Sequence, residues 1–308
     1  MTEQVARGLT PPVKILVLGA TGAGKTGALA SLVHAGYRIR MLDADAGSGL
    51  LRTLIGDTQR DALSVITLTE KLTPCDGHLF ALNPTEWMRC TNALTKWIDD
   101  EGRDLGSVST WDSNDVLVID TLRTLARCAY AFARKQSNRE RALESGMLWR
   151  ADMGGAQSLI LGLIDFLHSK HVKCTVVVNA HVRYSKPDGS SPTDIELEQA
   201  TREKRVIRMP GYPEVIGAKA GPIVPIYFND MVLIRRGSSG DAVIHTSACD
   251  DVDCKTSAPG RVKRTYPQRT GLAELFNDLT QIQSQTQGEH NSGTTGTAQP
   301  TTQSTTTK

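Results

Sequence analysis

Apolar runs alternate with amphipathic stretches along the first 180 residues of the chain. Runs without interspersed polar positions are typical of strands in a parallel sheet that is covered on both faces. The run at residues 116–120 is of this kind up to its last residue. Apolar-rich segments that contain some polar residues predict further strands over residues 13–18, 37–43, 64–68 and 173–180. The intervening stretches have helical periodicity, so the pattern indicates an α/β fold with a mostly parallel central sheet flanked by helices.

The amphipathic stretches predict helices over residues 25–34, 84–100, 121–135, 155–170 and 272–283. In the second of these, Trp87, Leu94 and Trp97 fall on one face. Two polar segments, 136–152 and 182–221, have no strong periodicity, apart from a short predicted helix near 194–204. Beyond them, residues 223–236 and 241–246 read as two strands joined by a Gly-Ser-Ser-Gly turn, which predicts a C-terminal β-hairpin region.

The length and composition fit one large domain. The chain has 308 residues, of which 39% are hydrophobic, enough for a sizeable core. We expect a lead-in over residues 1–12, a single domain over 13–283 and a tail over 284–308. The tail consists mainly of Thr, Gln, Ser and Gly, so it buries too little apolar surface to offset the entropy of ordering, and we expect it to be disordered.

Charge and cysteine usage narrow the classes of protein. The formal net charge is +2, so any nucleic-acid surface has to be a local patch rather than a property of the whole chain. The six cysteines follow no regular framework, which favours reduced thiols in a cytosolic protein. The first residues contain no signal-peptide pattern, and no apolar run reaches the roughly 20 residues of a membrane span. We therefore expect a cytoplasmic protein with no membrane partner.

A phosphate-binding pattern follows the first predicted strand. The pattern GxxxxGK[ST], placed between a strand and a helix, is the P-loop, in which glycines let backbone N–H groups surround phosphates. The lysine reaches the β- and γ-phosphates, and the hydroxyl binds Mg²⁺. The predicted nucleotide-binding residues are Gly19, Ala20, Thr21, Gly22, Ala23, Gly24, Lys25, Thr26 and Gly27.

Acidic residues end two of the predicted strands. Asp120 ends an apolar strand, which is the usual position of a carboxylate that supports the metal from the far side of a P-loop. We therefore predict that Thr26 and Asp120 bind Mg²⁺. Asp43 and Asp45 end the strand that follows the P-loop helix. One of them could orient the attacking water, and the alternative is that they cap a helix or face solvent.

Together these segments resemble the RecA-like branch of P-loop ATPases. Within it, the chain most resembles phage-encoded nucleotide-binding proteins of the AAA type, related to short phage single-strand annealing ATPases. The resemblance rests on the P-loop and on residues 42–47 (LDADAG), 116–122 (VLVIDTL) and 176–181 (VVVNAH). It implies a RecA-like P-loop NTPase fold and ATP hydrolysis with Mg²⁺. It assigns the general base to Asp45, where Glu is usual, and a γ-phosphate sensor to Asn179 or His181, with His181 preferred.

The resemblance also implies single-stranded DNA and a homo-oligomer as partners. The loops that contact DNA in this branch correspond to residues 136–152 and 182–221, and Tyr184 and Tyr212 could stack on bases. In related hexamers a late basic residue reaches the γ-phosphate of the neighbouring subunit. Here Lys255 has about that position, with Lys263 and Arg264 as alternatives.

The sequence thus favours an ATPase acting on single-stranded DNA in phage recombination or annealing, in the cytoplasm of the host cell. Turnover is expected to be slow until an oligomer or DNA completes the site. Three alternatives stay open: a helicase-type motor or loader, a nucleotide-dependent assembly switch that binds a protein, and a small-molecule kinase. No guanine-reading N/TKxD motif is apparent, which leans toward ATP.

Overall fold

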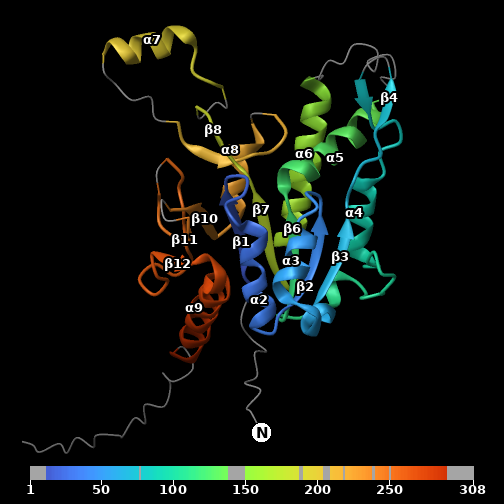
Figure 1. The fold of residues 1–308 in the computed structure, drawn as a ribbon, viewed down its shortest axis with the longest axis vertical. Coiled ribbons are helices and arrows are strands. Elements are labelled where there is room, and N and C mark those ends of the chain that lie inside the picture. The colour runs from blue at the N-terminus through green and yellow to red at the C-terminus, as the bar shows by residue number, and fades with distance from the viewer. Residues whose placement is uncertain are drawn as a thin grey trace, which may run out of the picture.

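An eight-stranded, mostly parallel sheet forms the centre of the molecule (Figure 1). The computed structural model describes residues 12–75, 78–137, 150–186, 190–203, 209–217, 219–237, 240–249 and 251–289. The strand order is β12-β11-β10-β1-β7-β6-β2-β3, and two small two-stranded sheets, β4-β5 and β8-β9, lie outside it. This is the mixed α/β architecture that the hydrophobic pattern predicts.

The strands are short, and those at the centre of the sheet are buried on both faces. Their bounds are β1 Lys14–Gly19, β2 Arg38–Asp43, β3 Leu63–Thr67, β4 Thr73–Cys75, β5 His78–Phe80, β6 Asp115–Asp120, β7 Thr175–Ala180, β8 Val182–Tyr184, β9 Gly211–Pro213, β10 Asp230–Arg236, β11 Ala242–His245 and β12 Thr265–Pro267. The six strands from β10 to β3 run parallel, and β11 and β12 add to that sheet in antiparallel pairing.

Helices cover both faces of the sheet. Their bounds are α1 Lys25–Ala28, α2 Ala30–His34, α3 Ser48–Ile55, α4 Glu86–Thr95, α5 Leu122–Gln136, α6 Arg150–His168, α7 Asp194–Arg202, α8 Ala220–Tyr227 and α9 Gln268–Glu289, with 3₁₀ turns η1 at Asp57–Ala62 and η2 at Val108–Thr110. One apolar core joins the sheet to α4, α5, α6 and α8, and a second joins the opposite face to α1, α2, α3 and α9. Within the described residues, no helix is long and apolar enough to cross a membrane.

The parallel register brings polar strand ends together. β1 lies between β10 and β7, and β6 lies between β7 and β2. In this register Asp43 of β2 is level with Asp120 of β6, and Asp120 is level with Asn179 of β7. The carboxyl ends of these strands meet at one edge of the sheet, which is where α/β sheets commonly bind ligands.

Two parts of the sequence prediction are wrong in detail. Residues 223–236 do not form one strand: α8 ends at Tyr227 and β10 begins only at Asp230. A short apolar run is compatible with either a helix or a strand, and here Val224 is buried on the helix. The helix predicted over 84–100 ends at Thr95. Trp97 is buried beyond the end of that helix, where its backbone N–H donates to the carbonyl of Gly106.

The segment 182–221 contains the short helix predicted near 194–204, which is α7, and a pair of strands that the sequence did not predict. β8 and β9 pair as a short antiparallel ribbon, and α7 lies between them in sequence, away from the main sheet (Figure 1). The backbone N–H of Glu214 donates to the carbonyl of His181 (2.7 Å), so the residue before β8 and the residue after β9 are bonded to each other.

The predicted domain limits meet the described residues only in part. α9 continues to Glu289, six residues into the predicted tail. The rest of the tail, residues 290–308, and most of the lead-in, residues 1–11, lie outside the described residues, as do residues 138–149 of the first predicted DNA loop.

Candidate functional site

The loop between β1 and α1 has the backbone of a phosphate cradle. Gly22 and Gly24 adopt left-handed conformations with φ of 74° and 100°, which side chains other than glycine adopt at a cost. A Cβ on Gly19 would lie 2.8 Å from the carbonyl oxygen of Ile234 on β10. Three of the predicted glycines are therefore needed to hold the loop in this shape.

Lys25 lies within the loop rather than in solvent. Its Nζ donates to the carbonyl oxygens of Gly19 (2.8 Å) and Ala20 (3.0 Å) and lies 3.3 Å from Nδ1 of His181. Burial lowers the pKa of Lys25, and the nearby carboxylates of Asp120 and Asp45 oppose this shift. The ammonium group is thus held against the backbone of the loop itself.

Thr26 and Asp120, the two predicted metal ligands, are in direct contact. The Thr26 hydroxyl donates to Oδ2 of Asp120 (2.6 Å), and Nδ2 of Asn179 donates to Oδ1 of Asp120 (3.2 Å). Asp120 is 1% exposed, and burial raises its pKa although the Thr26 and Asn179 bonds favour the ionised form. Among the described residues no cationic side chain bonds directly to Asp120, and a buried carboxylate in this state is suited to bind a cation.

A glycine and a further side-chain oxygen border this pair. A Cβ on Gly47 would lie 3.0 Å from Cγ2 of Thr26 and 3.1 Å from Oδ2 of Asp120, so only glycine leaves this approach open. The buried Oδ1 of Asn179 has no hydrogen-bond partner among the described residues. Mg²⁺ is usually held by one or two protein oxygens together with substrate phosphates, which is what Thr26 and Asp120 offer.

The structure separates the two acids that end β2. Asp43 is fully buried, and its carboxylate accepts hydrogen bonds from the backbone N–H groups of Gly47 (3.0 Å) and Ser48 (2.9 Å), at the start of α3. Asp43 therefore has the structural, capping role that was the alternative for this pair.

Asp45 faces the P-loop. It accepts hydrogen bonds from Thr121 (2.9 Å) and Thr124, and its Oδ2 lies 3.4 Å from Nε2 of His181. Burial acts to raise the pKa of Asp45, but these hydrogen bonds outweigh it and lower the pKa. Since the opposite nitrogen of His181 contacts Lys25, the imidazole connects the carboxylate to the P-loop lysine.

Lys255, the proposed trans-acting residue, lies elsewhere. It forms a backbone bridge with Met231, which is level with Leu16 of β1, three residues before the P-loop begins. Its side chain is exposed. Of the two alternatives, Lys263 forms an ion pair with Glu274 (3.0 Å). The backbone carbonyl of Arg264 accepts a hydrogen bond from the backbone N–H of Thr246 (3.0 Å).

The second predicted DNA loop pairs some of its own charges. Lys186 contacts Glu196 and Arg202 contacts Glu198 (3.7 Å). Tyr184 is 48% exposed at the end of β8. The basic residues of the two predicted loops are Arg139, Arg141 and Arg150 in the first, and Arg183, Lys186, Arg202, Lys204, Arg205, Arg208 and Lys219 in the second.

Sequence reasoning missed two side chains that touch the P-loop. Nε of Arg236, at the end of β10, donates to the carbonyl of Gly22 (2.9 Å), and Nε2 of Gln268, at the start of α9, donates to the carbonyl of Gly24 (2.8 Å). Both lie more than 200 residues beyond the loop, and neither belongs to a recognisable motif. Only the sheet order, which places β10 beside β1, could have pointed to Arg236.

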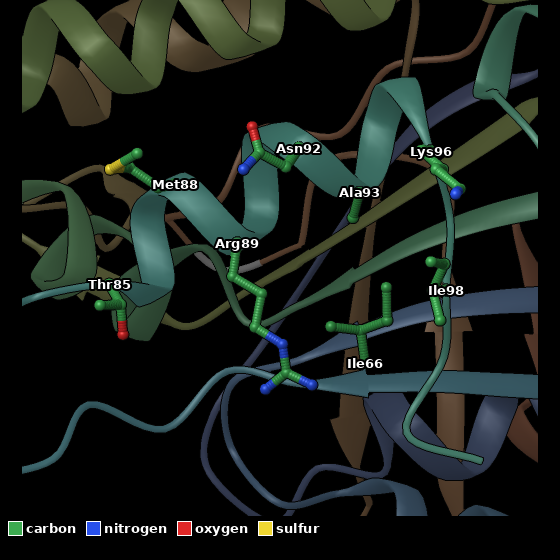
Figure 2. A pocket seen from close by; sticks show the side chains of 8 residues that line it. All are labelled: Ile66, Thr85, Met88, Arg89, Asn92, Ala93, Lys96 and Ile98. Carbon is green, nitrogen blue, oxygen red and sulfur yellow. The ribbon is translucent and has the colours of Figure 1, made fainter. Parts of the chain in front are cut away.

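A separate cavity of about 370 Å³ lies between α4 and the edge of the sheet (Figure 2). Its lining includes Ile66, Met88, Arg89 and Asn92, and no residue of the phosphate loop. We therefore do not associate it with the nucleotide.

Two solved structures give measures of similarity. The RadB recombinase has 17% identity and a TM-score of 0.37, with 77% of this chain and 81% of that chain covered. The flagellar accessory protein FlaH from Methanocaldococcus jannaschii has 9% identity and a TM-score of 0.35, with 85% and 89% covered. No protein-family model and no curated protein matches the chain. Since both TM-scores are below 0.5, the functional argument rests on the chain's own residues.

Proposed function

We propose that this protein is a RecA-like ATPase that binds ATP with Mg²⁺ at residues 19–27 and hydrolyses it. The observation that carries the proposal is the 2.6 Å contact between Thr26 and Asp120 beside the buried ammonium group of Lys25. These are the three groups that a P-loop site requires, and they come from segments almost 100 residues apart in sequence.

Each side chain has a separate task in this proposal. Lys25 neutralises the β- and γ-phosphates, and the backbone N–H groups of the loop bind the phosphate oxygens. Thr26 and Asp120 hold Mg²⁺, which when bound supplies positive charge at the same phosphates. Asp45, whose lowered pKa keeps it ionised at neutral pH, accepts a proton from the attacking water or orients it. His181, between Asp45 and Lys25, is suited to sense the γ-phosphate.

We further propose that the substrate polymer is single-stranded DNA, in recombination or annealing. The support is the resemblance of the four motif segments, the basic residues of 182–221 and the exposed ring of Tyr184. A homo-oligomer, with Lys255 of one subunit acting on the nucleotide of the next, would complete the charge stabilisation that a single chain lacks.

The test is ATP turnover by the purified protein with and without single-stranded DNA, at about 50 and 200 mM salt. We expect Mg²⁺-dependent turnover that DNA stimulates more strongly at low salt, because phosphate contacts release counterions. Lys25→Ala should abolish turnover while the protein remains folded. If ATP is hydrolysed without any response to DNA, the DNA role is wrong and the ATPase proposal stands. If no nucleotide binds, both are wrong.

One observation favours a second candidate, a nucleotide-dependent switch that binds a protein. On α7, Ile195 is 69% exposed and Leu197 is 47% exposed, while two basic residues of the same segment are paired with acids. Exposed apolar side chains fit a protein surface better than a phosphate backbone. In that case Ile195→Asp would abolish a nucleotide-dependent interaction, whereas Arg183→Ala would leave it and DNA-independent turnover unchanged.

A further inference from the structure

Gln268 brings the C-terminal helix onto the phosphate loop. A Cβ added to Gly24 would lie 3.1 Å from its Nε2, and one added to Gly27 would lie 2.9 Å from the same atom. These two glycines are three residues apart and face Gln268 together. The glutamine is partly exposed, so this contact lies at the surface of the site.

The orientation of the Gln268 amide follows from its partner. A carbonyl oxygen can only accept, so the nitrogen of the amide has to face the carbonyl of Gly24. Its oxygen, Oε1, then points elsewhere and has no hydrogen-bond partner within the described part of the chain. The side chain therefore offers one open acceptor next to the loop.

An exposed apolar side chain borders the same place. Cδ1 of Leu54, on α3, lies 3.6 Å from the position of a Cβ on Gly27, and Leu54 is 46% exposed. Gly27 thus has an apolar group and an amide on the side where a Cβ would point. An apolar surface with one well-placed polar group is typical of sites for flat organic ligands.

The other side of the loop is already assigned to the terminal phosphate. Asp120, Asp45 and His181 gather around Lys25, and none of them contacts Gln268 or Leu54. If the γ-phosphate lies toward these residues, the α-phosphate and the nucleoside lie toward the opposite end of the cradle. Gly24, Gly27, Gln268 and Leu54 make up the surface there.

We propose that Gln268 and Leu54 bind the nucleoside half of the nucleotide, with Oε1 of Gln268 accepting a hydrogen bond from it. The inference rests on the proposed function, since it concerns the same ligand. Two groups of ATP can donate: the amino group of adenine and the ribose hydroxyls. The carbonyl that guanine carries in place of the adenine amino group is an acceptor and cannot pair with Oε1.

The test is the affinity of the Mg²⁺ complexes of four ligands, measured by calorimetry. They are ATP, 2′-deoxy-ATP, purine riboside triphosphate, which lacks the amino group, and inorganic tripolyphosphate. We expect wild type to bind ATP more tightly than tripolyphosphate, and Gln268→Leu to weaken ATP about tenfold without affecting tripolyphosphate. If the adenine amino group is the donor, purine riboside triphosphate shows the loss in wild type, and if the 2′-hydroxyl is the donor, 2′-deoxy-ATP shows it.

Leu54 has a matched control on the same helix. Leu54→Ala should weaken ATP about threefold to tenfold, because it removes apolar contact area, and should leave tripolyphosphate unchanged. Leu50→Ala, one turn earlier and 55% exposed, should leave both affinities unchanged. Thermal unfolding of each variant checks that the fold is retained.

Three outcomes would overturn the inference without touching the proposed function. Equal weakening of ATP and tripolyphosphate by Gln268→Leu would mean that the side chain only supports the phosphate loop. Unchanged ATP affinity in both variants, with or without a change of oligomeric state, would exclude a nucleoside contact. Wild type that binds tripolyphosphate as tightly as ATP would do the same while leaving the phosphate site intact. If wild type binds neither ligand, the proposed function itself fails, and the inference with it.

Discussion

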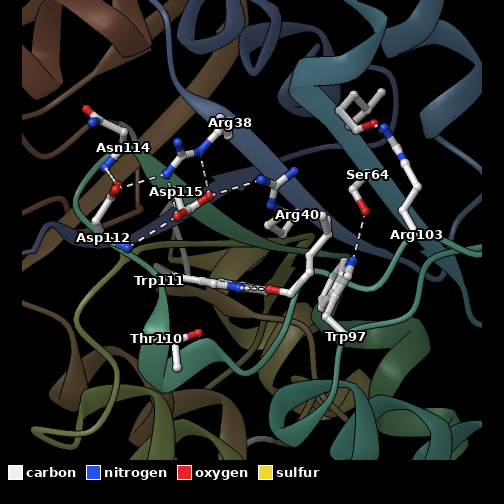
Figure 3. Close-up of polar contacts among 12 residues, drawn as sticks. Arg38, Arg40, Ser64, Trp97, Arg103, Thr110, Trp111, Asp112, Asn114 and Asp115 are labelled. Atoms are coloured by element: carbon white, nitrogen blue, oxygen red, sulfur yellow. Dashed lines mark hydrogen bonds and ion pairs between the residues drawn. The ribbon is translucent and has the colours of Figure 1, made fainter.

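The two ends of β2 and β6 carry charge in opposite ways. At the amino ends, Asp115 of β6 contacts Arg38 (2.8 Å) and Arg40 (3.2 Å) of β2, and Asp112 also contacts Arg38 (Figure 3). The hydrogen bond to Asp115 raises the pKa of Arg38 despite partial burial. The buried acid at this end, Asp115, thus has two guanidinium partners.

At the carboxyl ends the acids are in excess. Asp43 and Asp120 are level in the sheet and both buried, with Asp45 beyond them, and Lys25 is the cation that lies among them. Burial raises the pKa of Asp120, so its ionised form is held at a cost. We call the amino ends, where acids and guanidinium groups pair, the balanced end, and we expect it to stabilise the fold. We call the carboxyl ends, where acids are in excess, the unbalanced end, and we expect it to lower the stability of the fold while keeping a site for a cation.

The largest expected effect comes from removing one charge at the unbalanced end. Asp120→Asn should reduce Mg²⁺-dependent ATP turnover roughly 100-fold, because it removes a metal ligand. It should also stabilise the nucleotide-free protein: relief of about 1 kcal/mol corresponds to a rise in Tm of roughly 2–4 °C for a protein of this size. Turnover assays and calorimetric melting measure the two effects. A fall in Tm would mean that Asp120 is structural, like Asp115.

The balanced end should respond in the opposite sense. Asp115→Ala leaves Arg40 buried without its partner and should lower the free energy of unfolding by about 3 kcal/mol. Turnover per folded molecule should stay near the wild-type value, since Asp115 is at the far end of the strand from the P-loop. Denaturant titration and turnover at a temperature below the transition are the measurements. Loss of turnover without loss of stability would contradict the comparison.

The pH dependence sharpens the same contrast. Mg²⁺ competes with a proton for Asp120, so the apparent Mg²⁺ affinity should rise with pH, up to tenfold per unit, until the pH exceeds the raised pKa. Protonated Asp120 is the form that burial favours, so the nucleotide-free protein should be most stable at low pH. Its free energy of unfolding should fall as the pH rises from the ordinary pKa of an aspartate to the raised pKa of Asp120. Asp45, with its lowered pKa, changes stability only below about pH 4. Mg²⁺ titrations of turnover between pH 4.5 and 7.5 test this, and Asp120→Asn should abolish the dependence.

The smallest effect is expected for a separate set of hydrogen bonds at the start of β3. Nε1 of the buried Trp97 donates to Ser64 (2.8 Å) (Figure 3). Ser64 in turn donates to Asp99 (2.7 Å). Trp97→Phe removes one hydrogen bond and some volume, but Ser64 keeps its bond to Asp99. The expected loss is about 1–2 kcal/mol in chemical denaturation, with turnover unchanged. Trp97→Ala, which leaves a large cavity, should cost more.

Hydrophobic pattern and local motif account for most of the central sheet and for the phosphate loop. Strand-end residues such as Asp120 could be predicted to meet Thr26 because parallel strands end at one edge. The division of labour between Asp43 and Asp45 could not be predicted, since it depends on which carboxylate meets the N–H groups of Gly47 and Ser48. Long-range contacts such as that between Gln268 and Gly24 leave no signal in the local sequence. The apolar residues within 223–236 are compatible with either a helix or a strand, so the pattern could not place the boundary between α8 and β10.

The base of the β8–β9 ribbon shares a residue with the phosphate site. His181 is the last residue before β8, and Glu214 is the first residue after β9. The carbonyl of His181 accepts a hydrogen bond from the backbone N–H of Glu214, and the Glu214 side chain forms an ion pair with Arg123 of α5 (3.2 Å). A second bond, from the backbone N–H of Gly211 to the carbonyl of Asp251 (2.7 Å), ties β9 to a later part of the chain. Because His181 directly precedes β8 and also bonds to the residue after β9, one residue is shared by both ends of the ribbon and by the P-loop lysine contact.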